Sequence, residues 1–179
     1  HIFVRLMQII PFQERIELLA SLGESLKDLE DSRIQDTIHE ASLRNPWFSA
    51  GNILRSLVAI REEFLERSKL ENWLGKYPVA NDTGKTVGIV MAGNIPMVGF
   101  HDLLSAFAAG FRVQMKCSSK DEVLIPKLID LLAEIDPRVS HYFQKVDKLS
   151  GFDAVIATGG HTAATHFEYY FSKFPHIIR

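Results

Sequence analysis

An asparagine and a proline interrupt an apolar run in the stretch "VMAGNIPMVGFHD", residues 90–102. Asparagine is common in turns, so Asn94 could be a simple turn residue. Pro96, however, biases Ile95 toward extended geometry and can begin a following helix at its first position. This favours Asn94 at the end of a strand, where its amide N–H groups could stabilise an oxyanion without adding a charge.

Two further stretches carry residues suited to binding an anion. "KCSSKD", residues 116–121, places two hydroxyls between two lysines, and "ATGGHT", residues 157–162, contains Gly159 and Gly160. The glycine pair could let a helix N-terminus approach a phosphate closely, with backbone N–H groups as donors. It could equally form a tight turn that needs a positive φ. The pattern leaves both readings open.

The sequence gives less support for a nucleophilic cysteine or for histidine metal ligands. Lys116 could lower the pKa of Cys117, but no His-Asp pattern surrounds this cysteine, which favours a small inert hydrophobe at a strand end. His161 and His166 are five positions apart, about 140° around a helix, so they cannot ligate one metal as neighbours. The other histidines show no ligand spacing, so we do not expect a metal site.

The elements that would position these residues alternate after residue 85. Apolar segments predict strands over 86–92, 111–116, 138–146, 153–158 and 176–179, and helices over 97–110, 121–135 and 162–174. This alternation predicts a Rossmann-like parallel sheet in an α/β fold. Ligands of such sheets gather at the carboxyl ends of the strands. Three of those ends are polar or glycine-rich, which is the main argument from the residues for a ligand site.

The part of the chain before the sheet has a helical pattern. Ile53, Leu57, Ile60 and Phe64 recur at helical spacing, and Asp31 can cap a helix that begins after it. A stretch dense in turn residues, "GKYPVANDTGK", follows at residues 75–85. We therefore expect an N-terminal helical segment over 1–77 and a cofactor-binding α/β region over 85–179.

Composition excludes several classes of protein. The 179 residues are 46% hydrophobic with a net charge of −2, so nucleic acid and anionic membranes are not expected partners. No apolar run is long enough for a membrane span, and the single cysteine fits a reducing, cytoplasmic location. The chain begins with His and stops at "FPHIIR", so we expect a piece of a longer protein.

The sequence also resembles a known family. "VGIVMAGNIPMVGFHDLLSAFAAGFRVQMKCSSKD" and "DAVIATGG", with "FEYYFSKFPHIIR" after them, resemble the acyl-CoA reductases, which include the fatty-acid reductase of bacterial luminescence. That family belongs to the aldehyde dehydrogenase superfamily. The resemblance implies that a cysteine attacks an acyl-CoA or acyl-protein thioester and that NADPH reduces the resulting acyl-enzyme to an aldehyde.

The resemblance assigns roles to individual residues. Asn94 matches the oxyanion asparagine, and Lys116 matches the lysine that meets the adenosine ribose. Other cofactor contacts are implied at the strand ends, by Met91, Ala92, Gly93, Ser118, Ser119, Gly159 and Gly160. Serine is usual in the family where Gly160 stands. Cys117 aligns with a residue of the cofactor turn, so the nucleophilic cysteine and the catalytic domain are expected outside this chain.

The expected choice between NADPH and NADH depends on the residue at position 119, which is a serine. Superfamily members that prefer NAD commonly have a glutamate at this position, which binds the ribose hydroxyls and repels a 2′-phosphate. A neutral serine followed by Lys120 therefore implies NADPH rather than NADH, unless the serines merely cap the next helix.

Two other functions remain open from the sequence. The chain could be a non-catalytic nucleotide-binding or interaction module, or a structural α/β domain whose polar strand ends are only turns. The sequence is also compatible with a homo-oligomer and does not define the acyl chain.

Overall fold

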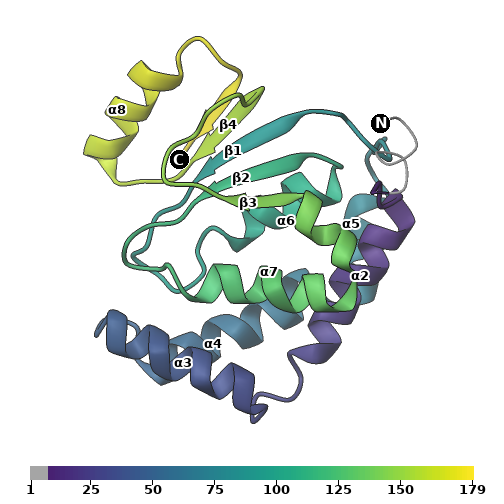
Figure 1. The fold of residues 1–179 in the computed structure, drawn as a ribbon, viewed down its shortest axis with the longest axis vertical. Helices are drawn as coiled ribbons and strands as arrows, with labels where there is room; N and C mark the ends of the chain where they lie inside the picture. Colours follow the sequence, from purple (N-terminus) through teal and green to yellow (C-terminus); the bar gives the residue numbers. More distant parts are fainter. Residues whose placement is uncertain (1–7) are drawn as a thin grey trace.

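One parallel sheet forms the centre of the computed structural model, which describes residues 8–179 (Figure 1). Its strands are β1 (Thr86–Val90), β2 (Arg112–Lys116), β3 (Phe143–Lys145), β4 (Ala154–Ala157) and β5 (His176–Ile178). They lie in the order β3-β2-β1-β4-β5, and every neighbouring pair is parallel. The predicted Rossmann-like α/β sheet is therefore confirmed.

Helices cover both faces of this sheet, as a parallel sheet requires. The connecting elements are α6 (Phe100–Ala108), α7 (Leu124–Ile135), the 3₁₀ turn η2 (Pro137–His141) and α8 (His161–Phe171). Figure 1 shows α6 and α7 between the sheet and the N-terminal helices, and α8 on the other side. Phe107 and Leu103 of α6 are fully buried, whereas no residue of α8 is.

The predicted N-terminal helices are also present. They are α2 (Phe12–Ser25), α3 (Ser32–Arg44), α4 (Ala50–Ala59), which continues as a π-helical turn (Ile60–Phe64), and α5 (Arg67–Leu74). Asp31 caps α3 as expected, since its carboxylate accepts the Arg33 N–H at 2.8 Å. Buried residues of these helices and of the sheet form one continuous hydrophobic core. The N-terminal helices and the sheet, with α6 and α7 between them, therefore share one core.

A buried arginine connects the helices to the first strand. Arg15 of α2 has no exposed surface, and its guanidinium donates to the backbone carbonyls of Ala80 and Asn81 at 2.7 and 2.6 Å. The Arg15 Nε also donates to the carbonyl of Ala108, at the end of α6. Residues 75–85 form neither helix nor strand, but Arg15 holds this segment where it leads into β1.

Three predicted boundaries are wrong, each for a local reason. The helix expected over 97–110 begins only at Phe100, because residues 94–99 form turns, so Pro96 does not begin it. The helix expected from 121 begins at Leu124. Only Phe143–Lys145 of the strand expected over 138–146 is extended, since Pro137 starts a 3₁₀ turn capped by Asp136.

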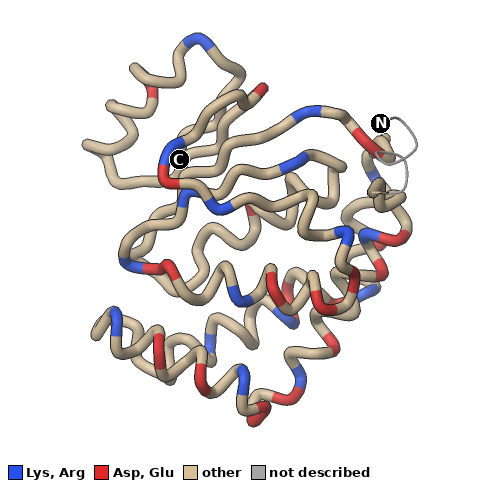
Figure 2. The backbone as a smooth tube through the Cα atoms, in the orientation of Figure 1, with Lys and Arg blue, Asp and Glu red and all other residues tan. Residues whose placement is uncertain are grey.

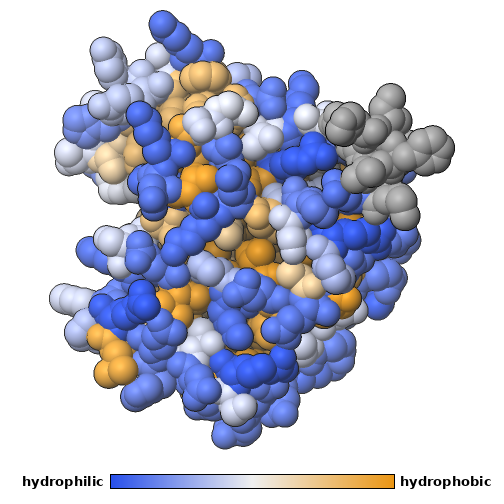
Figure 3. Space-filling view, viewed as in Figure 1, coloured by the Kyte–Doolittle hydropathy of each residue, from blue (hydrophilic) through white to orange (hydrophobic). Residues whose placement is uncertain are grey.

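The surface carries both signs of charge throughout. Figure 2 shows basic and acidic residues interspersed along α2, α3 and α7. Among residues 8–179, none of the helices is long and apolar enough to cross a membrane. Figure 3 shows a hollow between the α8 side and the α3–α4 side of the molecule, where the loops after β1 and β2 lie in Figure 1.

Candidate functional site

Strands β1 and β4 are parallel neighbours at the centre of the sheet. The chain proceeds from β1 toward β2 on one side and from β4 toward β5 on the other, which defines a topological switch point. Hydrogen bonds align the strand ends: the Met91 N–H donates to Lys116 O at 3.1 Å, and the Thr158 N–H donates to Val90 O at 2.9 Å. The three polar strand ends therefore meet at one edge, as predicted.

Asn94 lies at the open end of this edge. Its side chain is exposed, and among the described residues it makes no hydrogen bond, so its amide is available to a ligand. The preceding Gly93 is buried, and a Cβ there would lie 2.7 Å from Ser118 Cβ and 2.9 Å from Lys120 Cβ. Glycine at 93 therefore allows the β1 end to lie directly against the turn after β2. Met91 points inward, where its side chain packs over Gly99.

A buried carboxylate fixes the loop that follows Asn94. Asp121 is 5% exposed, and its Oδ2 accepts the Met97 N–H at 2.6 Å. Met97 has a φ of 59°, the only positive φ at a non-glycine residue among residues 8–179. Burial raises the pKa of Asp121, against the lowering effect of the Met97 hydrogen bond. This contact holds Met97 in the left-handed region and joins the loop of Asn94 to the turn after β2.

The turn after β2 presents Ser119 and Lys120 to solvent, and both side chains are exposed. The Ser118 hydroxyl instead accepts the Lys120 N–H at 3.3 Å, which shapes the turn. Neither serine caps α7, because that helix begins after Val123 without a side-chain cap. Lys116 donates from Nζ to the carbonyl of Asp147 at 2.6 Å. A ribose contact by Lys116 would therefore require this hydrogen bond to be exchanged.

The two glycines after β4 serve different purposes. Gly160 has a φ of −67° and caps α8, with open space where a Cβ would be. At Gly159 a Cβ would lie 2.9 Å from Ala163 Cβ and 3.0 Å from a ring atom of Phe167. Neither glycine has a positive φ, so the tight-turn reading is wrong. Gly159 lets α8 pack closely on the end of β4, so the N–H groups of the first turn of α8 lie at the carboxyl edge of the sheet.

A polar cluster that the sequence pattern did not predict lies beside the start of this helix. Asp102 of α6 is 4% exposed, and its carboxylate pairs with the Arg179 guanidinium and accepts the Thr158 hydroxyl at 3.4 Å. An acidic residue within the apolar pattern of α6 was the available signal. The cluster joins α6 to the ends of β4 and β5, on the opposite side of the switch point from Ser119.

Cys117, just after the end of β2, is a half-buried free thiol. Burial raises the pKa of its thiol, Lys145 opposes this, and Asp121 and Glu122 raise it further. We expect alkylation of Cys117 to be slower than that of a free thiol at neutral pH, with a rate profile shifted to higher pH. Iodoacetamide labelling followed by mass spectrometry tests this. Labelling as fast as a model thiol, or loss of acyl transfer in full-length Cys117→Ser, would contradict it.

No cluster of His, Cys, Asp and Glu within residues 8–179 could hold a metal ion.

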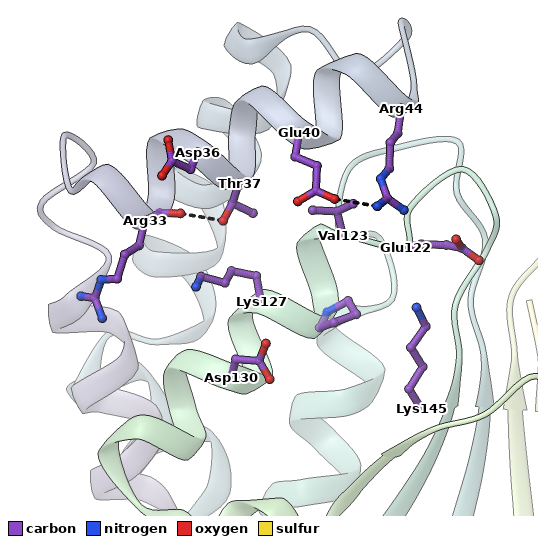
Figure 4. Close-up of a pocket in the computed structure, with 11 residues that line it drawn as sticks. Arg33, Asp36, Thr37, Glu40, Arg44, Glu122, Val123, Lys127, Asp130 and Lys145 are labelled. Atoms are coloured by element: carbon purple, nitrogen blue, oxygen red, sulfur yellow. Dashed lines mark hydrogen bonds and ion pairs between the residues drawn. The ribbon is translucent and has the colours of Figure 1, made fainter.

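A polar groove of about 500 Å³ lies between α3 and α7 (Figure 4). Its charged lining residues are Arg33, Asp36, Glu40, Arg44, Glu122, Lys127, Asp130 and Lys145. Cations and carboxylates balance one another there, and none of the predicted site residues lines it.

Comparison with known proteins establishes the fold. The chain matches a betaine aldehyde dehydrogenase double mutant from Staphylococcus aureus, solved with NAD+, with a TM-score of 0.67 and 13% identity. The chain has an aldehyde dehydrogenase-type fold. The match covers 94% of this chain and 38% of the dehydrogenase, so the chain spans less than half of that protein's length. Neither a protein-family model nor a curated protein sequence matches the chain.

Proposed function

We propose that this aldehyde dehydrogenase-type chain forms the cofactor-binding part of an oxidoreductase. The reaction is the NADPH-dependent reduction of a fatty acyl thioester, such as an acyl-CoA, to the aldehyde. The observation that carries the proposal is the meeting of Asn94, Ser119 and the first turn of α8 at the switch point of a parallel sheet.

The residues at this edge fit a dinucleotide. Gly160 leaves open space beside the N-terminal N–H groups of α8, which suits a diphosphate. Ser119 and Lys120 offer an exposed hydroxyl and an exposed cation for the ribose end. The strand end formed by Met91, Ala92 and Gly93 would lie along the cofactor. When bound, NADPH would supply a hydride.

Asn94 would act on the acyl group. Its amide donates to the carbonyl oxygen of the thioester as negative charge develops there, and the Asp121–Met97 contact fixes the loop from which it donates. A cysteine outside this chain would form the acyl-enzyme and release the thiol of the carrier. Hydride addition to the acyl carbon would then break its bond to the cysteine sulfur, so that the aldehyde leaves and the cysteine is regenerated. The overall reaction is thioester, NADPH and a proton giving aldehyde, thiol and NADP+.

The test is to assay the full-length protein with a long-chain acyl-CoA and, separately, with the corresponding aldehyde. We expect NADPH oxidation that depends on acyl-CoA, with one free thiol and one aldehyde formed per NADPH consumed. Aldehyde oxidation without any thioester turnover would favour an ordinary dehydrogenase. Nucleotide binding with neither reaction would favour a non-catalytic binding module.

Cofactor choice gives a separate prediction. Ser119→Glu in the full-length protein should lower kcat/KM for NADPH on the order of tenfold or more, because the new carboxylate would repel the 2′-phosphate. The same change should leave kcat/KM for NADH equal or higher. Ser119→Gln, of similar size and without charge, serves as the matched control. A preference of the unmodified enzyme for NADH would show that this turn does not select the cofactor.

A further inference from the structure

The loop that carries Asn94 is held at both ends by the turn after β2. At the start of the loop, a Cβ on Gly93 would lie 2.9 Å from Lys120 Cβ, so the two backbones are in direct contact. At its end, the Met97 N–H donates to Asp121 Oδ2 at 2.6 Å. Asn94 lies between these contacts and makes no hydrogen bond within the described part of the chain. The position of its amide therefore depends on them.

Asp121 is an unusual residue for such a contact. It is 5% exposed, and its Oδ1 is buried without a hydrogen-bond partner among residues 8–179. Burying a carboxyl group with only part of its hydrogen bonds costs free energy. An apolar side chain would avoid this cost, so the stability of the fold does not account for Asp121. What the carboxylate provides is an acceptor for the Met97 N–H.

Met97 needs this acceptor because of its backbone conformation. Its φ of 59° lies in the left-handed region, which a methionine adopts only when its surroundings hold it there. Its side chain is 3% exposed and belongs to the hydrophobic core. The core thus anchors the side chain, and the bond to Asp121 fixes the peptide between Pro96 and Met97. That peptide orients the chain that leads back to Asn94.

The turn after β2 does not depend on the Asp121 side chain for its own shape. The Asp121 N–H donates to Ser118 O at 2.9 Å, and the Lys120 N–H donates to Ser118 Oγ at 3.3 Å. The Lys120 carbonyl accepts from Asn45 Nδ2 at 3.0 Å. Removing the carboxylate should therefore release the loop after β1, while the turn that presents Ser119 keeps its shape.

We propose that Asp121 is the positioning residue of the oxyanion donor. It acts on thioester reduction only through Asn94, by holding the loop after β1 in the conformation from which the Asn94 amide reaches the acyl oxygen. The inference rests on the proposed function. It gives the turn after β2 two separate roles, one toward the nucleotide through Ser119 and one toward the acyl group through Asp121.

The test is a double-mutant cycle in the full-length protein, assayed with a long-chain acyl-CoA and NADPH. Asp121→Ala should lower kcat on the order of ten- to a hundredfold, the cost of displacing a catalytic group by about 1 Å. NADPH affinity should stay within about twofold, because the turn that binds the nucleotide is kept. In the Asn94→Ala background, the same change should lower kcat by less than about twofold, since the donor is already absent. Asp121→Asn keeps an acceptor for Met97 and should recover most of the loss.

Amide hydrogen exchange provides a readout that does not need turnover. The Met97 amide should exchange faster in Asp121→Ala than in the unmodified protein or in Asp121→Asn. Asp153→Ala is the matched control, because Asp153 also accepts a backbone N–H, that of Thr86 at 2.8 Å, but at the start of β1. This control should change neither kcat nor the exchange of Met97.

An equal loss of kcat from Asp121→Ala with and without Asn94 would overturn the inference, because Asp121 would then act by another route. Loss of the fold, or a parallel loss of NADPH affinity, would also overturn it, since Asp121 would then have a general structural role. Unchanged exchange of Met97 would show that the contact does not hold the loop. Failure of the proposed function would appear instead as absent acyl-CoA reduction by the unmodified protein, whatever the exchange of Met97.

Discussion

Asn94→Ala in the full-length enzyme is expected to lower kcat for acyl-thioester reduction on the order of 10²–10³-fold, with little change in NADPH affinity. An oxyanion donor acts on charge that develops in the transition state, so its loss costs about 3 kcal/mol there. The side chain is exposed at the strand end and makes no hydrogen bond within residues 8–179, so the fold should tolerate the change.

Two variants make the Asn94 experiment specific. Asn94→Asp keeps the size of the side chain but replaces the donor with a negative charge, so it should be at least as damaging as alanine. Asn72→Ala removes an exposed amide on α5, away from the site, and should have no effect. A loss of NADPH affinity with unchanged single-turnover acylation would mean that Asn94 is a cofactor contact or a turn residue.

Arg15→Met should destabilise the protein by about 3 kcal/mol or more, because each buried carbonyl left without a donor costs about 1–3 kcal/mol. Four carbonyls accept from this guanidinium, those of Ile10, Ala80, Asn81 and Ala108, at 2.6–3.2 Å. Methionine would fill part of the space but could donate to none of them. Burial also lowers the pKa of Arg15, in keeping with its desolvated position.

The Arg15 effect is measured by thermal unfolding of the purified protein, followed by circular dichroism. Arg33→Met is the control, since Arg33 is about half exposed and its ion pairs with Asp31 and Glu134 lie at the surface. Such pairs contribute about 0–1 kcal/mol. Equal losses in the two variants would contradict the role of Arg15 in holding the segment before β1.

Sequence periodicity predicted the sheet because the strands and helices after residue 85 are strongly apolar and regularly spaced. Val87 and Ile89 are buried as a central strand requires, and Gly110 ends α6 with a φ of 85°. These features depend on residues close together in the chain, so local patterns predict them well.

The details of the site depended on contacts between distant residues. Helix α6 begins later than expected, at Phe100. The Met97 N–H instead donates a hydrogen bond to Asp121, 24 positions later in the chain, which holds the preceding residues in turns. The helix expected over 121–135 includes Asp121, whereas the structure uses this residue to hold the loop of Asn94. Likewise, nothing in the local pattern places Asn45 against Lys120, 75 positions later. The sequence therefore predicted which strand ends are polar, but not that the helical segment contacts the turn after β2.

Amide hydrogen exchange of the full-length protein with and without NADPH tests the location of the site most directly. We predict protection of three separate segments, residues 91–94, 116–121 and 158–163, which meet at the carboxyl edge of the sheet. Protection confined to the groove between α3 and α7, or no protection of these segments at saturating NADPH, would contradict a cofactor site at the switch point.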